Sequence, residues 1–352
     1  MDTTNNILKI QPPVSLGLLM SYRCNTACRY CIYASSPEWE SNWLKEEDAE
    51  LIFSHLKRIF NEVYPGTSYT SVRDNVSFSY GLHFTGGEPF LNYKLLLKLT
   101  ELAKKTDLPA TFVETNCFWA RDDSATEEKM IELKKAGLGG ILISVNPFTV
   151  ESIPFERIDR AVRIGDKFFG SNLIVYQNFY LSLFREMKLK GKLSFEDFLK
   201  KIELQNFYNN IELLPMGRTP YRLGDLFQKY PAKSYLTQNC YSEMTRNWHT
   251  HIDNYCNYIP GFCAGISLGD FREYDSLFSS GVDLKNKPVI NALITNLAEL
   301  IDLGKQFGFK ENSDGYISKC HLCTEIRKHI ISRTSEFDEL SPVQFYKNIN
   351  SG

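Results

Sequence analysis

The stretch VSLGLLMSYRCNTACRYC, residues 14–31, decides how the rest of the chain is interpreted. It begins with an apolar run typical of a buried strand and ends with three cysteines spaced C-x3-C-x2-C, at Cys24, Cys28 and Cys31. Three thiolates this close suit a four-iron cubane, because the loop can leave one iron without a protein ligand. A zinc site would need a fourth Cys or His close by, and the next histidine is His55. The pattern therefore predicts an iron–sulfur site after the first strand.

More strand-like runs follow and alternate with amphipathic helical patterns. The strand runs cover residues 14–20, 80–84, 110–114, 140–145, 172–176 and 210–214. The helical patterns between them cover residues 46–64, 92–105, 125–137 and 155–169. This alternation predicts a parallel sheet, because a parallel crossover needs a connection of helix length. Such sheets carry their chemistry on loops at the carboxyl ends of the strands, where TGGEP (85–89) and TNC (115–117) follow the second and third strands.

Composition and charge narrow the class of protein. The chain has 352 residues, of which 43% are hydrophobic and 23% charged, as in ordinary globular proteins. The net charge of −2 offers no basic excess for nucleic acid or an anionic membrane. We find no signal peptide and no run of about eighteen apolar residues, so we expect a cytoplasmic protein. Nine cysteines, an odd number, favour metal ligation over a disulfide framework in that compartment.

The cysteine motif, with Tyr30 directly before its last cysteine, resembles the signature of the radical S-adenosylmethionine (SAM) superfamily. The resemblance implies a 4Fe-4S cluster on Cys24, Cys28 and Cys31, whose free iron chelates SAM. It also implies reductive cleavage of SAM to a 5′-deoxyadenosyl radical that abstracts hydrogen from a substrate. In such an enzyme the cofactor performs the difficult chemistry, and the protein positions it.

TGGEP resembles the GGE motif of the same family. Gly86 and Gly87 would let the backbone approach the ligand, and Glu88 could accept hydrogen bonds from the SAM ammonium group. Weaker matches follow in chain order: TNC, in which Cys117 replaces a glycine, ISVN (143–146), in which Asn146 takes the place of an aspartate, and LLPMGR (213–218). The SAM contacts that the resemblance implies are Tyr30, Gly86, Gly87, Glu88, Thr115, Asn116, Ser144 and Met216.

A second group of cysteines lies beyond residue 239 and resembles the SPASM/twitch extension of radical SAM enzymes. Cys240, Cys263, Cys320 and Cys323 match the four ligand positions of one auxiliary 4Fe-4S cluster, and Cys256 is an alternate ligand. In the full SPASM pattern further cysteines follow the C-x2-C pair. Here no cysteine follows Cys323, and His329 stands six residues after it. We therefore expect one auxiliary cluster. A structural zinc ribbon on the same four cysteines is the alternative that spacing leaves open.

Two further features have a structural and a functional interpretation. Residues 248–260, WHTHIDNYCNYIP, predict a short hairpin. Within it His249, His251 and Asp253 alternate and would share one face of a strand. There they either contact substrate or cluster, or they are structural residues whose hydrogen bonds are satisfied. Cys117 is either a packing thiol or a substrate contact.

The expected architecture is α/β: a partial (β/α)6 radical SAM barrel over residues 10–220 and a small twitch/SPASM-like cluster-binding domain over residues 221–340. The resemblance makes a peptide or protein side chain the leading substrate, with cofactor or small-molecule biosynthesis as the alternative. An iron–sulfur or zinc-binding scaffold is the non-enzyme alternative. About thirteen residues precede the first strand, which lowers the expectation of a leader-peptide recognition domain. An electron donor such as flavodoxin or ferredoxin is the expected partner.

Overall fold

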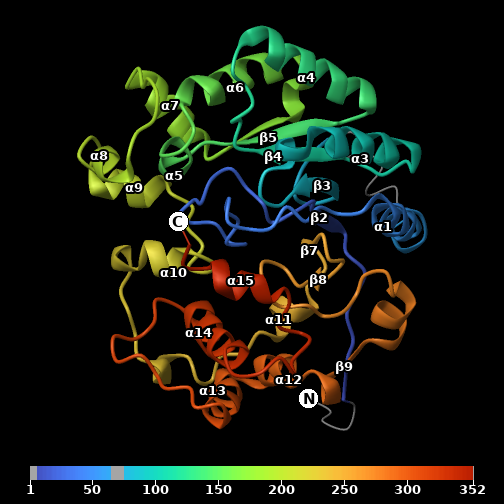
Figure 1. Cartoon of the computed structure of the whole chain (residues 1–352), viewed down its shortest axis with the longest axis vertical. Coiled ribbons are helices and arrows are strands. Elements are labelled where there is room, and N and C mark those ends of the chain that lie inside the picture. Colours follow the sequence, from blue (N-terminus) through green and yellow to red (C-terminus); the bar gives the residue numbers. More distant parts are fainter. Residues whose placement is uncertain (1–5, 65–74, 352) are drawn as a thin grey trace.

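The computed structural model describes residues 6–64 and 75–351, and it is built around one seven-stranded sheet (Figure 1). The strand order is β6-β5-β4-β3-β2-β7-β8. Neighbouring strands from β6 to β7 are all parallel, and only β8 runs antiparallel to its neighbour. The sheet is open, with β6 and β8 at its edges. The predicted α/β class with a parallel sheet is confirmed.

The strands are β1 (Ile7–Leu8), β2 (Ser15–Leu19), β3 (Gly81–Thr85), β4 (Phe112–Thr115), β5 (Gly140–Ser144), β6 (Leu173–Tyr176), β7 (Thr250–Ile252), β8 (Tyr258–Ile259) and β9 (Val282–Asp283). The helices of the first half are α1 (Glu46–Arg58), α3 (Tyr93–Lys105), α4 (Asp123–Ala136), α5 (Pro147–Val150), α6 (Phe155–Phe169), α7 (Asn178–Glu186), α8 (Phe195–Leu199) and α9 (Leu204–Asn210). Those of the second half are α10 (Thr219–Arg222), α11 (Tyr241–Thr245), α12 (Pro288–Thr295), α13 (Leu297–Gln306), α14 (Lys319–Ile331) and α15 (Val343–Asn348). Shorter turns of helix are η1 (Ile59–Val63), η2 (Pro89–Asn92), η3 (Gly170–Asn172), η4 (Gly224–Leu226), η5 (Ala232–Ser234), η6 (Ser276–Ser280) and η7 (Leu284–Asn286).

The crossover helices form where the sequence carries amphipathic periodicity and end signals. Helix α4 begins behind Asp122, whose side chain accepts a hydrogen bond from the Ala125 N–H, and ends at Gly137 in the left-handed region. Helix α3 begins in the same way behind Asn92. In Figure 1 helices α3, α4 and α6 lie on one side of the strands, and α12, α13 and α14 lie in the other half of the molecule.

The predicted sixth strand, residues 210–214, is wrong. Strand β6 ends because Gln177 adopts a left-handed backbone, with φ of 65°. The Gln177 side chain then meets the backbone of Glu212, accepting from its N–H at 3.4 Å and donating to its carbonyl at 3.5 Å. The Gln177 side-chain amide thus takes the hydrogen bonds that a neighbouring strand would make. The described residues of the first half of the chain therefore supply five parallel β/α strands and not six.

The opposite side of the sheet is extended by the second half of the chain. Strand β7 pairs in parallel with β2, through Leu16–Thr250, Gly17–His251 and Leu18–Ile252. The hairpin predicted around residues 248–260 supplies both β7 and β8. The division into domains at residue 220 stays a prediction, and the sheet itself crosses that boundary.

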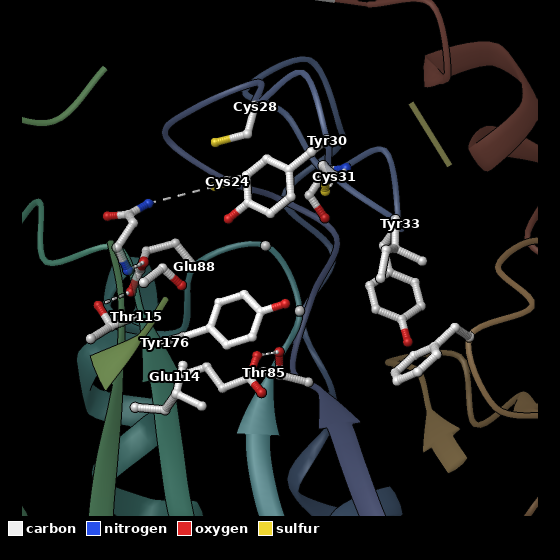
Figure 2. A pocket seen from close by; sticks show the side chains of 18 of the residues that line it. Cys24, Cys28, Tyr30, Cys31, Tyr33, Thr85, Glu88, Glu114, Thr115 and Tyr176 are labelled. Atoms are coloured by element: carbon white, nitrogen blue, oxygen red, sulfur yellow. Dashed lines mark hydrogen bonds between the residues drawn. The ribbon is translucent and has the colours of Figure 1, made fainter. Parts of the chain in front are cut away.

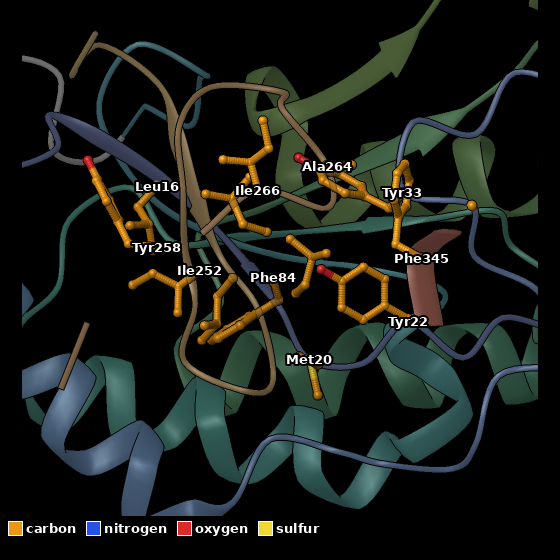
Figure 3. Close-up of a cluster of buried hydrophobic side chains, with 14 of the residues drawn as sticks. Leu16, Met20, Tyr22, Tyr33, Phe84, Ile252, Tyr258, Ala264, Ile266 and Phe345 are labelled. Carbon is orange, nitrogen blue, oxygen red and sulfur yellow. The ribbon is translucent and has the colours of Figure 1, made fainter. Parts of the chain in front are cut away.

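Side chains from both halves form a continuous core beside β2 (Figure 3). Ile252 and Ile266 from the second half join Leu16 and Phe84 from the first in one cluster of buried apolar residues. Among the residues that the structure describes, no helix has the length and apolarity needed to cross a membrane.

We predict that β7 is an integral part of the fold. Ile252 is completely buried, so Ile252→Ala should lower the free energy of unfolding by about 2–5 kcal/mol through lost burial and the cavity that remains. Leu51→Ala is the matched control, because Leu51 is 40% exposed, and it should change stability by less than about 0.5 kcal/mol. Urea denaturation measures both variants. Equal stability of the two variants would mean that β7 can detach without cost.

Candidate active site

Three cysteines lie on the loop that leaves β2, and the loop is held by its own backbone. Cys24 N–H donates to the Ser36 carbonyl at 3.1 Å, and Cys31 N–H donates to the Cys28 carbonyl at 3.2 Å. The Thr26 hydroxyl lies 3.4 Å from the sulfur of Cys24 and 3.4 Å from that of Cys28. The loop therefore gathers its thiols at one place above the sheet (Figure 2).

Burial disfavours the charged form of these thiols. It raises the pKa of Cys28 to about 11, and it raises that of Cys24 further, with the neighbouring Cys28 adding to the effect. Thiolates at such positions need positive charge close to them. Metal ligation supplies that charge, so the donor set fits an iron–sulfur cluster.

Arg218 holds the cysteine loop from the other side, and sequence reasoning missed it. Its side chain is fully buried and donates to the carbonyls of Cys28, at 2.9 Å, and Ser35, at 3.1 Å. Its backbone N–H donates to the Cys31 carbonyl at 3.0 Å. The signal available in the sequence was the arginine of LLPMGR itself. A buried guanidinium needs several hydrogen-bond acceptors, and the end of a loop offers backbone carbonyls.

Met216, a predicted SAM contact, is not among the described residues that line the cavity of the N-terminal cysteines, and its contact with SAM stays a prediction. Gly217 has a φ of 58°, and a Cβ on it would come within 2.5 Å of the Ile32 backbone. This turn places Met216 against the cysteines near the C-terminus, in a cavity separate from the one that the N-terminal cysteines line.

The glycines of TGGEP bring their backbone against the cysteine loop. Gly87 N–H donates to the Ser21 carbonyl at 2.8 Å, and a Cβ on Gly87 would lie 1.9 Å from the Arg23 carbonyl oxygen. Gly86 has a φ of 125°, and a Cβ there would lie 2.3 Å from the Ser21 oxygen. The close approach that these glycines allow is to the protein's own loop, and a contact with SAM stays a prediction.

Glu88 is placed by hydrogen bonds beneath the cysteines. One carboxylate oxygen accepts from the Thr115 hydroxyl at 2.9 Å and the Phe90 N–H at 3.2 Å, and the other accepts from the Asn116 N–H at 2.8 Å. The Asn116 side-chain amide donates a hydrogen bond to the side-chain oxygen of Asn25 in the cysteine loop, at 2.9 Å. Burial raises the pKa of Glu88 to about 7, although these three donors oppose the shift.

Two further predicted SAM contacts, Tyr30 and Ser144, also reach this site. Tyr30 is held by Asn146, which donates to its hydroxyl at 2.9 Å and caps α5 with its side-chain oxygen. Ser144, at the end of β5, lines the cavity. Cys117 is buried with a φ of 64°, the backbone region that glycine favours, and is not among the described residues that line the cavity. This position fits the packing interpretation of Cys117.

A cavity of about 580 Å³ opens beside the cysteines and Glu88. Beyond Glu88 it contains two more acidic residues, Glu114 and Glu212, and the described part of its wall has no lysine or arginine. The Thr85 hydroxyl donates to Glu114 at 2.6 Å, and burial raises the pKa of Glu114 to about 7. The aromatic residues of the wall are Tyr30, Tyr33, Phe78, Tyr176, Trp248 and Phe262.

Comparison with known proteins identifies this arrangement. Residues 18–169 match the model of the radical SAM superfamily. This segment is a radical SAM domain. It contains the three cysteines, Glu88 and the strand ends from β2 to β5.

Two curated relatives match less than half of the chain. The putative peptide biosynthesis protein YydG of Bacillus subtilis is 25% identical over 154 residues, which cover 44% of this chain and 42% of that protein. GTP 3',8-cyclase of Mycolicibacterium smegmatis is 30% identical over 155 residues, which cover 44% of this chain and 37% of that protein. The chain thus spans about two fifths of the length of these relatives.

Two solved structures resemble the chain more remotely. BtrN in complex with AdoMet and 2-DOIA has a TM-score of 0.46 at 13% identity and covers 82% of this chain and 89% of its own. The structure of anSMEcpe with bound AdoMet and the Cp18Cys peptide has a TM-score of 0.41 at 16% identity and covers 92% and 98%.

Outside the radical SAM domain, the four predicted auxiliary ligands come together. Cys240, Cys263, Cys320 and Cys323 line a small cavity of about 40 Å³. Burial raises the pKa of Cys263 and of Cys320 to about 12 in each case, with neighbouring cysteines of the group adding to the shift. Arg327 is buried beside them and donates to the Cys323 sulfur at 3.2 Å. Four thiols and one cation fit a metal centre, and the ligand assignment stays a prediction.

Cys256 does not line the cavity of these four cysteines. It occupies the turn between β7 and β8 with a φ of 67°, which is the backbone conformation of a hairpin glycine. The charges that act on it come from Asp48, Asp253, Asp270 and Arg272.

The expectation that Asp253 shares a face with His249 and His251 is wrong. The Asp253 carboxylate accepts from the Tyr22 hydroxyl at 2.9 Å and from the backbone N–H groups of Tyr255 and Asn257. Asp253 follows the last residue of β7, where the chain turns, so the alternation of side chains stops before it. His249 and His251 both line the cavity.

Proposed function

We propose that the chain is a radical SAM enzyme that modifies a peptide or protein side chain. The observation that supports the reaction type is the convergence of three buried thiols, a backbone-held carboxylate and a cavity at the carboxyl ends of the strands of the radical SAM domain. A non-catalytic iron–sulfur or zinc scaffold would need the cysteines but not this cavity with its buried carboxylate.

Cys24, Cys28 and Cys31 would hold a 4Fe-4S cluster. When bound, the cluster and SAM supply a 5′-deoxyadenosyl radical by reductive cleavage, and this radical abstracts hydrogen from the substrate. Glu88 is placed to accept hydrogen bonds from the SAM amino group, because Thr115, Asn116 and Phe90 orient both of its oxygens. Tyr30, Asn116, Ser144 and the TGGEP backbone complete the proposed binding site.

The charge of the cavity supports a peptide substrate over a nucleotide. One relative is named for peptide biosynthesis and the other is a GTP cyclase. A nucleoside triphosphate is normally held by arginine and lysine side chains. The described wall of this cavity carries carboxylates and aromatic rings instead, and Trp248 at its edge is 53% exposed. A neutral or cationic peptide side chain fits such a wall better than a phosphate-bearing substrate does.

The second cysteine group supports a twitch-like domain with one auxiliary 4Fe-4S cluster. Four thiolate ligands would saturate the four irons of a cubane, so no iron would have a free coordination position. Such a cluster suits electron transfer or a structural role. A reduced iron–sulfur protein such as ferredoxin, or a flavodoxin, is the proposed electron donor. We place the protein in the cytoplasm, because thiolate ligation needs the reducing conditions found there.

The first prediction concerns SAM cleavage. Anaerobically reconstituted protein reduced with dithionite should convert SAM to 5′-deoxyadenosine, and Cys28→Ala should abolish the product because the cubane loses a ligand. Cys256→Gly is the matched control, since glycine suits its left-handed backbone, and it should keep the native rate. Mass spectrometry measures the product. Native turnover by a variant lacking Cys24, Cys28 and Cys31 would refute the assignment.

The second prediction concerns the pH dependence of SAM affinity. Because the pKa of Glu88 is about 7, its carboxylate is lost as the pH falls through 7, and SAM binding should weaken from pH 7.5 to pH 5.5. An α-amino group has a pKa of about 7.7–8.0 and ligates iron only when it is neutral, so part of the pH dependence belongs to SAM itself. Glu88→Gln should lower affinity at pH 7.5 by about 1.5–3 kcal/mol and reduce the pH dependence to that part.

Calorimetric titration across this pH range measures the affinity, and the cluster spectrum should stay unchanged. Glu114→Gln is the matched control, because its pKa is also about 7 while its partner is Thr85, so it should retain the pH dependence. Equal affinity of Glu88→Gln and wild type at pH 7.5 would remove Glu88 from the SAM site.

The third prediction distinguishes an auxiliary cluster from a zinc ribbon. Reconstituted wild type should contain about eight irons and eight sulfides, from two cubanes. A variant with Cys24, Cys28 and Cys31 changed to Ala should retain about four of each. Cys256→Gly should match wild type, because Cys256 lies outside the group. Elemental analysis that finds one zinc and no iron in the triple variant would contradict the auxiliary cluster.

A further inference from the structure

Three buried histidines meet on the inner face of the sheet, next to the cavity. Gly17 of β2 pairs with His83 of β3 on one side and with His251 of β7 on the other, so the three positions form a row across neighbouring strands. His249 lies two residues before His251 and shares its face. Sequence reasoning noticed His249 and His251 but not His83, which a parallel sheet brings to them from a distant part of the chain.

The sheet makes room for these rings with a glycine. A Cβ on Gly17 would lie 2.7 Å from Nε2 of His83 and 2.7 Å from Nε2 of His251. The two Nε2 atoms therefore face the same small space above Gly17. The three histidines each offer a ring nitrogen within 4.8 Å of those of the other two.

Two of the rings are oriented through their Nδ1 atoms. Nδ1 of His251 lies 2.8 Å from the Gly261 carbonyl and must carry the proton that it donates there, which leaves Nε2 with a lone pair. Nδ1 of His249 lies 3.0 Å from the Ser15 hydroxyl. Histidines that bind metals usually have their second nitrogen held by a hydrogen bond in this way.

His83 lacks the hydrogen bonds that a structural histidine normally makes. Its side chain is 1% exposed, and neither ring nitrogen has a hydrogen-bond partner among the described residues. Nε2 lies 3.3 Å from a carboxylate oxygen of Glu114 without forming a hydrogen bond. Leaving a buried polar group unpaired costs about 1–3 kcal/mol, so the cluster is incomplete as it stands.

The electrostatics of the cluster suit neutral imidazoles. Burial is the main cause that lowers the pKa of each histidine, to about 4 for His249. His249 lowers the pKa of His83 and of His251 further, and His251 lowers that of His83. Neutral imidazole is the form that ligates metals. The positive charge of Arg246 disfavours protonation of His249 and His251, whereas the Phe78 backbone favours protonation of His249. The Glu114 carboxylate lies beside His83 and would balance the positive charge of a bound cation.

We propose that His83, His249 and His251 form a binding site for a divalent first-row metal ion, with zinc as the probe. A tetrahedral zinc ion with Zn–N bonds of about 2.0–2.1 Å holds its ligand atoms about 3.4 Å apart, so modest ring rotations close the site. Glu114 is the carboxylate nearest to the site. Because His249 and His251 line the cavity, a remaining coordination position would face the substrate, where a carbonyl or carboxylate group could bind. The site does not depend on the proposed radical chemistry.

Zinc binding to the reconstituted holoprotein tests the proposal, because the cysteines are then occupied by iron. After chelator treatment and desalting, one zinc per chain should bind, and X-ray absorption at the zinc edge should show only nitrogen and oxygen neighbours at about 2.0–2.1 Å. Sulfur neighbours at about 2.3 Å would place the zinc on cysteines and overturn the site. Failure to retain zinc would overturn it as well.

Variants identify the ligands. His83→Phe should weaken zinc binding at least about tenfold, and its ring should still pack, since His83 stacks on Phe112 at 4.9 Å between ring centroids. His251→Phe should do the same, and His329→Phe is the control, because His329 contacts the Phe307 carbonyl away from the site. Iron content and circular dichroism report the fold of each variant. Wild-type zinc affinity in both His83→Phe and His251→Phe would refute the proposal.

Discussion

The approach of the TGGEP turn to the cysteine loop is the contact on which the rest of the site depends. Gly87 packs its backbone directly onto the carbonyl of Arg23, at a distance that no side chain would permit. The hydrogen bonds from Gly87 N–H to Ser21 and from Glu88 N–H to Arg23 then fix the loop to the end of β3. Because Glu88 follows directly, its carboxylate is carried under the thiols, where Thr115 and Asn116 of the next strand end can hold it.

The sequence predicted the features that depend on local pattern. Five of the six strands and the hairpin were found because apolar runs and turn residues are local signals, and the thiols were found because their spacing is short. The segment at residues 210–214 failed because a single side chain, Gln177, ends β6 and takes the backbone partners that a sixth strand would need.

The missed residues are those whose role arises from contacts between distant parts of the chain. Arg218 acts on the carbonyls of Cys28 and Ser35, about 190 residues away, and nothing in the spacing of LLPMGR indicates this. His83 is an isolated histidine in the sequence and gains its neighbours only because β3 and β7 flank β2. Cys256 is separated from the other cysteines because the hairpin turn, where it adopts a positive φ, lies away from their cavity.

The position of β2 between β3 and β7 has a consequence for how the protein assembles. One neighbour of this strand, β7, lies 234 residues further along the chain, as the Ser15–His249 contact shows. Contacts of such long sequence separation carry a high loop-closure cost and form slowly. During synthesis the strand that leads into the cysteine loop therefore has an unpaired edge until most of the chain has left the ribosome. Chaperoning of the exposed β2 edge would protect the chain from aggregation in this interval.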